Sequence, residues 1–237
     1  MTDRGLDAVI FDWGGTLSAF VALELLDVWR TAAHHLDPAR EDELTVALLA
    51  VEERFWARTT TTQESGTLAD LLAEASRDLG LDVAEAVLEE AAVHHLDSWT
   101  PHIAHDADAV AVLSALRERG LAIGLLSNTH WPRAFHEEFL ARDGLDGLID
   151  ARLYSSELSH LKPHPSVFRA ALDAVGVDDP ARAVFVGGRP LDDIHGAQQV
   201  GMRAVLRPNP DVPAYDVVPD AEIASLPELI PLVDGWR

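Results

Sequence analysis

Lys162 is the only lysine among the 18 lysine and arginine residues of this chain. An ammonium is a compact charge whereas a guanidinium is a planar fork, so a single lysine indicates a site that requires the smaller cation. The residues around it read Leu-Lys-Pro-His-Pro, and prolines restrict the backbone on which they lie. We therefore expect Lys162 to be held toward an anionic partner.

Polar residues follow three other apolar, strand-like segments: Asp12 follows residues 8–11, Ser127 follows 122–126, and Asp192-Asp193 follows 183–186. Each alone could be a helix cap or a turn residue. In a parallel sheet, however, the carboxyl ends of the strands meet at one edge, where ligands bind. Four such polar positions at one edge, together with the only lysine, are not easily accidental and indicate a site for chemistry on a ligand.

The elements that must position these residues alternate along most of the chain. Short β-favouring segments are separated by segments with helical periodicity from residue 101 onward, which predicts βαβ units and a doubly wound, Rossmann-like parallel sheet of the α/β class. The expected strands cover residues 8–11, 122–126, 151–154, 183–186, 203–206 and 221–224.

The segment after the first strand differs, because it is rich in Ala, Leu and Glu and lacks an obvious strand. Its periodicity predicts four helices that form an α-helical bundle. We expect a cap domain over residues 17–100, inserted into a catalytic core made of residues 1–16 and 101–237. The predicted cap helices cover residues 20–35, 41–57, 67–79 and 83–96.

Composition limits the classes of partner. The formal net charge of the 237 residues is −22 at pH 7, which argues against nucleic acid and anionic membranes because both require a basic surface. The absence of cysteine excludes disulfides and thiolate chemistry, and no apolar run reaches the roughly 20 residues of a membrane span. We expect a cytoplasmic enzyme that binds a small molecule, with Lys162 and Arg189 as local cations for an anionic substrate.

Four segments together resemble the motifs of the haloacid dehalogenase superfamily, which includes many phosphatases. Their order and spacing are similar over essentially the whole chain, and the helical segment lies between the first motif and the second, as in capped members. The segments are Asp12–Leu17, Leu126–Asn128, Lys162–Pro165 and Val186–Ala197.

The resemblance implies a role for each matching residue. Asp12 would be the nucleophile that forms an aspartyl intermediate, Ser127 would donate a hydrogen bond to the transferred group, and Lys162 would stabilise negative charge. Mg²⁺ would be the cofactor of a phosphatase. The implied substrate-binding residues are Trp13, Gly14, Asn128 and Arg189, and the implied metal ligands are Asp12, the carbonyl oxygen of Gly14, Asp192 and Asp193.

Two residues depart from the phosphatase pattern. Gly14 stands where these phosphatases usually have a second aspartate, which protonates the leaving oxygen and later activates water, a contribution of roughly 10²- to 10⁴-fold. Gly188 stands where a Gly-Asp pair would supply a metal ligand. The chain therefore lacks two carboxylates that phosphatase chemistry would use.

Three interpretations remain. The first is a Mg²⁺-dependent phosphatase of a small metabolite, with leaving groups, such as acyl phosphates, that need little protonation. The second is a metal-independent 2-haloacid dehalogenase-type hydrolase, in which Asp192 would activate water. The third is an inactive member with a binding role. Carbon–phosphorus hydrolysis is excluded, because that branch uses a cap lysine and this cap contains none.

The histidines add two expectations. His34-His35 and His94-His95 lie on predicted cap helices, where adjacent residues face different directions, so neither pair should chelate a metal. His130 and His195 are candidates to replace the missing acid, because an imidazole titrates near neutral pH, although a packing or surface role is expected for most histidines. Substrate identity does not follow from the mixed composition of the cap.

Overall fold

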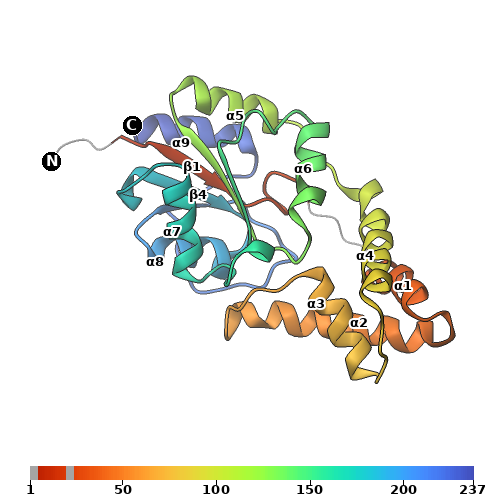
Figure 1. The fold of residues 1–237 in the computed structure, drawn as a ribbon. Helices are drawn as coiled ribbons and strands as arrows, with labels where there is room; N and C mark the ends of the chain where they lie inside the picture. Colours follow the sequence, from red (N-terminus) through yellow and green to blue (C-terminus); the bar gives the residue numbers. More distant parts are fainter. Residues whose placement is uncertain (1–4, 20–23) are drawn as a thin grey trace.

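The computed structural model describes residues 5–19 and 24–237. Its centre is a six-stranded parallel sheet with the order β3-β2-β1-β4-β5-β6 (Figure 1). The predicted α/β fold and all six predicted strands are confirmed, the last being two residues shorter than expected. The strands are β1 (Ala8–Phe11), β2 (Ala122–Ser127), β3 (Ala151–Tyr154), β4 (Ala183–Gly187), β5 (Arg203–Leu206) and β6 (Ala221–Glu222).

Helices cover both faces of this sheet. The central strand β1 is buried along its whole length, because its side chains alternate between two hydrophobic clusters on opposite faces. Figure 1 shows α5 and α9 over one face and α7 and α8 over the other. The helices of the core are α5 (Ala109–Glu118), α6 (Arg133–Arg142), α7 (Pro165–Ala174), α8 (Gly196–Gln199) and α9 (Leu229–Gly235).

The helical segment between β1 and α5, which we call the helical insertion, contains the four predicted helices. They bury a hydrophobic cluster of their own around Trp29, Leu48, Phe55 and Leu72. Residues 20–23, which the first predicted helix included, lie outside the described residues, as do residues 1–4. None of the described helices is long and apolar enough to cross a membrane. The helices are α1 (Leu25–Leu36), α2 (Glu41–Ala57), α3 (Leu68–Asp78) and α4 (Glu85–Trp99).

The two chain segments that connect the helical insertion to the core pair with each other. Ser18 and His105 form an antiparallel bridge, and the N–H of Asp106 donates to the carbonyl of Leu17 at 2.8 Å. Arg207 then joins both segments, because its guanidinium donates to the carbonyl of Thr16 and to the carboxylate of Asp106, each at 2.6 Å. The connection is therefore held at the carboxyl end of β1, immediately after Asp12.

A second connection joins the α2–α3 loop to the loop that precedes Lys162. The N–H of Leu161 donates to the carbonyl of Gln63 at 3.0 Å, and the N–H of Ser65 donates to the carbonyl of Ser159 at 3.1 Å. The side chain of Leu161 is buried in the hydrophobic cluster of the helical insertion. The lysine loop is thus packed against the insertion.

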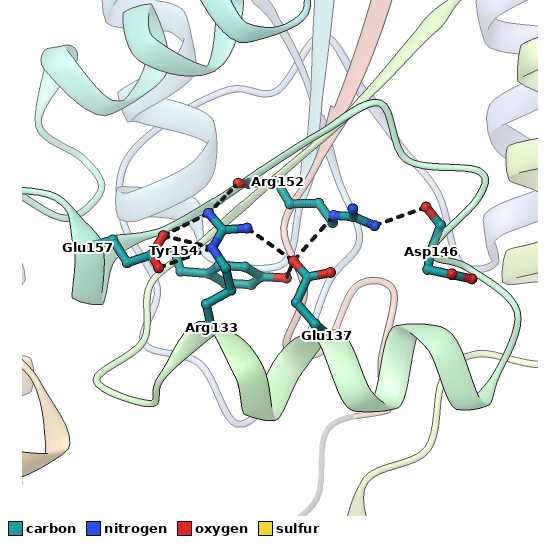
Figure 2. Close-up of polar contacts among 6 residues, drawn as sticks. All are labelled: Arg133, Glu137, Asp146, Arg152, Tyr154 and Glu157. Atoms are coloured by element: carbon teal, nitrogen blue, oxygen red, sulfur yellow. Dashed lines mark hydrogen bonds and ion pairs between the residues drawn. The ribbon is translucent and has the colours of Figure 1, made fainter.

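A network of charged residues fixes α6 against β3 (Figure 2). Arg133 donates to Glu137 and to Glu157, each at 3.0 Å, and its guanidinium lies 4.9 Å from the centre of the Tyr154 ring. The Tyr154 hydroxyl donates to Glu137 at 3.2 Å, and Arg152 pairs with the same carboxylate. Since α6 follows the loop after β2, this network also supports the loop that carries Ser127 and Asn128.

The segment after β4 differs from the single helix predicted through residues 194–200. Residues Pro190–His195 form a π-helical turn, and only Gly196–Gln199 continue as the α-helix α8. Such turns are frequent at functional sites because they alter the direction of side chains within a helix. Here the turn buries both Asp192 and Asp193 beneath the carboxyl end of β4.

Candidate active site

The ammonium of Lys162 lies between two carboxylates. Its Nζ donates to Oδ1 of Asp12 at 2.8 Å and to Oδ1 of Asp193 at 2.6 Å. All three residues are buried, and the lysine is 1% exposed. The structure therefore brings together residues from three of the four motif segments as one charged cluster.

Asp12 is positioned by the central strand. Its N–H donates to the carbonyl of Val186 at 2.9 Å, which continues the β1–β4 pairing one residue beyond β1. The Thr16 hydroxyl donates to Asp12 Oδ2 at 3.3 Å, a longer contact than the one from Lys162 to Oδ1. Oδ2 is therefore the less strongly held oxygen of this carboxylate.

Asn128 holds the lysine loop in place. Its Oδ1 accepts from the Lys162 N–H at 2.7 Å, and its Nδ2 donates to the Lys162 carbonyl at 2.9 Å. These reciprocal bonds satisfy the backbone of Lys162 with a single side chain. Asn128, which the resemblance assigned to substrate binding, thus positions the backbone of Lys162 through its side chain.

The electrostatics of Lys162 favour the charged form. Burial by itself would lower the pKa of Lys162, but the negative charges of Asp12 and Asp193 and their hydrogen bonds outweigh burial and raise it. The ammonium therefore stays protonated at neutral pH. For Asp193, burial and the charge of Asp12 raise the pKa, whereas Lys162 and the N–H of Arg189 stabilise the ionised form.

Asp192 lies in the most unusual environment of the cluster. Burial and the charge of Asp193 raise the pKa of Asp192 to about 7, against the lowering effect of Arg189 and Lys162. Its Oδ1 is buried without a hydrogen-bond partner. A buried carboxylate oxygen without a partner is costly, so this atom is available for a ligand.

Other predicted site residues lie at the same edge of the sheet. Ser127 is buried at the end of β2, and Gly14 is exposed two residues after Asp12. Arg189 has an exposed side chain, while its N–H donates to Asp193 Oδ2 at 2.8 Å. The Trp13 side chain is buried and donates to His105 Nε2 at 3.0 Å, so it packs beside the linkers and leaves its backbone for the site.

The family comparison agrees with this geometry. A family model described as haloacid dehalogenase-like hydrolase matches residues 6–201. The chain belongs to this family. The matched residues include all the members of the charged cluster and the helical insertion, so the resemblance of the motifs is confirmed.

Relatives of this haloacid dehalogenase-like hydrolase have different activities. Phosphoserine phosphatase of Thermus thermophilus is 37% identical over 52% of this chain and 48% of its own length, so the match spans about half of that relative. Glyceraldehyde 3-phosphate phosphatase of Methanopyrus kandleri is 30% identical over 66% of this chain and 68% of its own length. (S)-2-haloacid dehalogenase 4A of Burkholderia cepacia is 30% identical over 53% of this chain and 54% of its length.

Solved structures of the same family match this chain over nearly its whole length. A 2-haloacid dehalogenase from Pseudomonas syringae covers 98% of this chain and all of its own, with 26% identity and a TM-score of 0.74. A HAD phosphatase from Thermococcus onnurineus covers 97% of this chain and 99% of its own, with 25% identity and a TM-score of 0.61. The family hydrolyses substrates on this fold, and both phosphatases and dehalogenases are similar to this hydrolase.

The two histidines considered as replacement acids are placed elsewhere. Both ring nitrogens of His130 are buried without partners, and burial lowers the pKa of His130 to about 3. Its ring packs against aromatic residues of the helical insertion, including Phe55 at 5.6 Å, which is the packing role considered for it. His195 contacts Gln199 and the ring of Tyr215, which gives it neighbours on the surface of the core.

Sequence reasoning missed an aromatic cluster where the helical insertion meets the core. We call it the aromatic bridge. Its rings touch in series from α1 and α4, through the loop after β2, to the residue after Asp12. No spacing signal marked it, because its members come from five separated segments. The bridge consists of Trp13, Trp29, Phe55, Trp56, His95, Trp99, His130, Trp131 and His136.

The charged cluster contains the type of donor atom that a hard divalent cation takes. Asp12 and Asp193 contact the single ammonium of Lys162, and the carboxyl group of Asp192 lies within the electrostatic influence of Asp193, so carboxyl groups outnumber cations in this buried cluster. Oxygen donors are what Mg²⁺ prefers, and the buried Asp192 Oδ1 has no partner. The donor types match those of the metal that the resemblance implied, but the oxygens of these three carboxylates do not all lie within 4.8 Å of one another in the described residues.

Proposed function

We propose that this hydrolase is a Mg²⁺-dependent phosphatase of a small phosphorylated metabolite, acting through an aspartyl phosphate on Asp12. The observation that carries the proposal is the ammonium of Lys162, which lies 2.8 Å from the Asp12 carboxylate. In the same cluster, the buried Oδ1 of Asp192 has no hydrogen-bond partner. This arrangement favours binding of a cation together with a phosphate dianion.

In the first step, an oxygen of Asp12 forms a bond to phosphorus, and the bond from phosphorus to the leaving oxygen breaks with its electron pair on that oxygen. Lys162 offsets the charge of Asp12, which lessens repulsion as the phosphate approaches. Ser127 would donate to a phosphoryl oxygen. Water then adds to phosphorus, the Asp12–phosphorus bond breaks, and inorganic phosphate leaves.

The Mg²⁺ ligands would be Asp12, Asp192, Asp193 and the carbonyl oxygen of Gly14. When bound, Mg²⁺ would neutralise charge on the phosphoryl oxygens. Binding of a divalent ion would also relieve the electrostatic cost of holding three carboxylates beside one ammonium, since an opposite charge favours the ionised form of each.

The leaving group is limited by Gly14. Because a glycine cannot donate a proton, the leaving oxygen must depart with little protonation or receive its proton from water. We propose acyl phosphates, and other phosphates with acidic leaving groups, as the substrate class. Phosphatases among the relatives act on small phosphorylated molecules according to their names, which supports a metabolite substrate.

We propose that residues 17–100 are a cap over a catalytic core of residues 1–16 and 101–237. The aromatic bridge and the packing of Leu161 into the helical insertion support this division. In capped hydrolases the enclosed surface selects the substrate, and the paired linkers at Ser18 and His105 would be the hinge.

A second candidate is a 2-haloacid dehalogenase-type activity. One observation favours it: position 14 is a glycine and offers no proton donor. A halide leaves without a proton, so a dehalogenase does not need an acid at this position. The solved 2-haloacid dehalogenase, with its TM-score of 0.74, is compatible with this alternative. Asp12 would then displace halide from carbon, and water would cleave the resulting ester.

Turnover of an acyl phosphate and of an activated aryl phosphate, with Mg²⁺ and with chelator, tests the proposal. Phosphate release that requires Mg²⁺ and is lost in Asp12→Asn supports the phosphatase. Halide release from a 2-chloroacid under chelator, also lost in Asp12→Asn, would support the dehalogenase instead. If neither phosphate nor halide is released, the result counts against both activities and favours a binding role.

A further inference from the structure

The helical insertion brings together one histidine from each of two pairs, His34-His35 and His94-His95, that lie far apart in the sequence. His35 on α1 and His94 on α4 stack with ring centres 3.5 Å apart and an angle of 3° between the planes. Adjacent histidines on one helix do diverge, as expected, but the packing of α1 on α4 places these two face to face. The expectation concerned each adjacent pair on its own helix; the contact between the two helices, which it did not consider, brings one member of each pair together.

A carboxylate completes the group. Glu90 precedes His94 by one helical turn on α4, and the ligand atoms of His35, Glu90 and His94 all lie within 4.8 Å of one another. In the part of the chain that the structure describes, no other group of three or more His, Asp and Glu side chains meets this distance condition, and the carboxylates around Asp12 do not meet it either. The two clusters also differ in ligand type, because this one contains two imidazoles.

We propose that His35, Glu90 and His94 form a binding site for a divalent transition metal, with Zn²⁺ as the best-matched ion, and that the ion joins α1 to α4. Two imidazole nitrogens and one carboxylate oxygen are a ligand set that Zn²⁺ takes, leaving a fourth position for water. Mg²⁺ is excluded as the preferred ion, because it selects oxygen ligands.

Several features of the site suit such an ion. His35 and His94 are partly buried, and both line a surface pocket of about 510 Å³ that could supply the water ligand. Binding requires the parallel rings to turn apart so that both lone pairs point at one ion, and the exposed Glu90 can follow them.

The ion would act on the helical insertion as a whole. α1 and α4 are its first and last helices: α1 is the first helix after β1, and α4 is the last before α5 of the core. A metal bound to the folded state alone would stabilise it in proportion to the logarithm of ion concentration. Since the site uses none of the residues around Asp12, this inference does not depend on the phosphatase proposal.

The test uses the untagged full chain, stripped of metal and kept in excess Mg²⁺ so that oxygen sites are filled. Titration with Zn²⁺ should show one bound ion per chain, and the melting temperature should rise with Zn²⁺ concentration. Co²⁺ should give the visible absorption of a nitrogen-ligated ion. His35→Ala, His94→Ala and Glu90→Gln should each weaken Zn²⁺ binding at least ~10-fold.

The structure offers a matched control in the core. His160 and His164 also stack, with centres 3.8 Å apart and planes at 8°, but no carboxylate joins them in a group of three. His160→Ala should leave Zn²⁺ affinity unchanged, and so should Asp12→Asn. Equal Zn²⁺ affinity in the wild type, His35→Ala and His94→Ala would overturn the proposal and assign the pair to helix packing, as would loss of binding in Asp12→Asn.

Discussion

Leu161 and Lys162 are adjacent in the chain, yet their side chains enter different parts of the molecule. Leu161 is buried in the hydrophobic cluster of the helical insertion, whereas the ammonium of Lys162 is buried between Asp12 and Asp193 in the core. Any displacement of the insertion therefore acts on the backbone that carries the lysine. The packing of the insertion and the position of the charge are physically coupled.

This coupling predicts that Leu161→Ala lowers kcat as well as stability. Truncation of a buried leucine leaves a cavity and costs about 2–5 kcal/mol of unfolding free energy, and here it also loosens the lysine loop. Leu72→Ala is the control, because Leu72 is buried in the same cluster on α3. Denaturant melts and steady-state kinetics at a temperature where both variants are folded should show a lower kcat only for Leu161→Ala; equal kcat values would contradict the coupling.

Lys162→Arg is expected to lose activity despite keeping the positive charge. The ammonium contacts two carboxylates at 2.8 and 2.6 Å in a fully buried position, and a longer planar guanidinium cannot occupy it without displacing Asp12 or Asp193. Loss of a positioned group that stabilises transition-state charge costs roughly 10²- to 10³-fold in kcat, measured by phosphate release.

Lys162→Met separates charge from shape at the same position. It leaves two buried carboxylates without their partner, which should cost about 3–5 kcal/mol of stability by denaturant unfolding. If Lys162→Met folds as stably as the wild type and Lys162→Arg retains full activity, the lysine is not the electrostatic centre of the site.

Gly14→Asp is expected to raise phosphatase activity. A side-chain carbon built on Gly14 meets no atom within 4 Å, and its backbone is not left-handed, so an aspartate can be accommodated there. The new carboxyl could protonate the leaving oxygen, a gain of up to about 10²- to 10⁴-fold. Gly188→Asp is a poorer choice, because its side chain would meet the carbonyl oxygen of Arg207 at 3.3 Å.

The gain should depend on the leaving group. An alkyl phosphate, whose leaving oxygen needs a proton, should benefit more from Gly14→Asp than an acyl phosphate does. Gly14→Asn is the control of similar shape without an acidic proton, and it should give no gain. The same increase in phosphatase activity for both substrates, or an increase in the asparagine variant, would mean that the lack of a proton donor at position 14 does not limit the reaction.

The sheet and the charged cluster could be predicted from the sequence because their signals are local. β1 is a short apolar segment that ends at Asp12, and its two hydrophobic faces follow from full burial in a parallel sheet. The convergence of Asp12, Lys162 and Asp193 follows from topology, since parallel strands end at one edge. The π-helical turn at Pro190–His195 was missed because its hydrogen bonding has no distinct sequence pattern.

Contacts between helices could not be predicted in the same way. The stacking of His35 on His94 depends on the axial rotation of α1 against α4, which periodicity does not specify. Of the two roles considered for His130, replacement acid and packing, the sequence could not show that packing applies, because the burial of this loop residue depends on contacts with the distant helical insertion. Burial by a distant segment decided its protonation state.

The aromatic bridge predicts that acid weakens the folded state below pH 6.5. Burial lowers the pKa values of His95, His130 and His136 to about 3, from an ordinary value of 6.5. Between these two values the unfolded chain takes up protons that the folded chain does not bind. Stability is therefore lost as pH falls through 6.5 toward 3, by up to about 1.4 kcal/mol per pH unit for each histidine.

His130→Phe isolates one of these contributions. Phenylalanine keeps an aromatic ring among Trp29, Phe55 and Trp56 but removes the titrating group. The slope of unfolding free energy against pH should therefore fall between pH 6 and 4 by about 1.4 kcal/mol per pH unit, the contribution of one proton. Phe55→Leu serves as the control, because it alters a ring that packs against His130 without removing a titrating group, and it should leave the slope unchanged. Urea unfolding across this pH range measures both slopes; an unchanged slope in His130→Phe would show that the ring is protonated in the folded protein, and that the core and the helical insertion do not seal it from water.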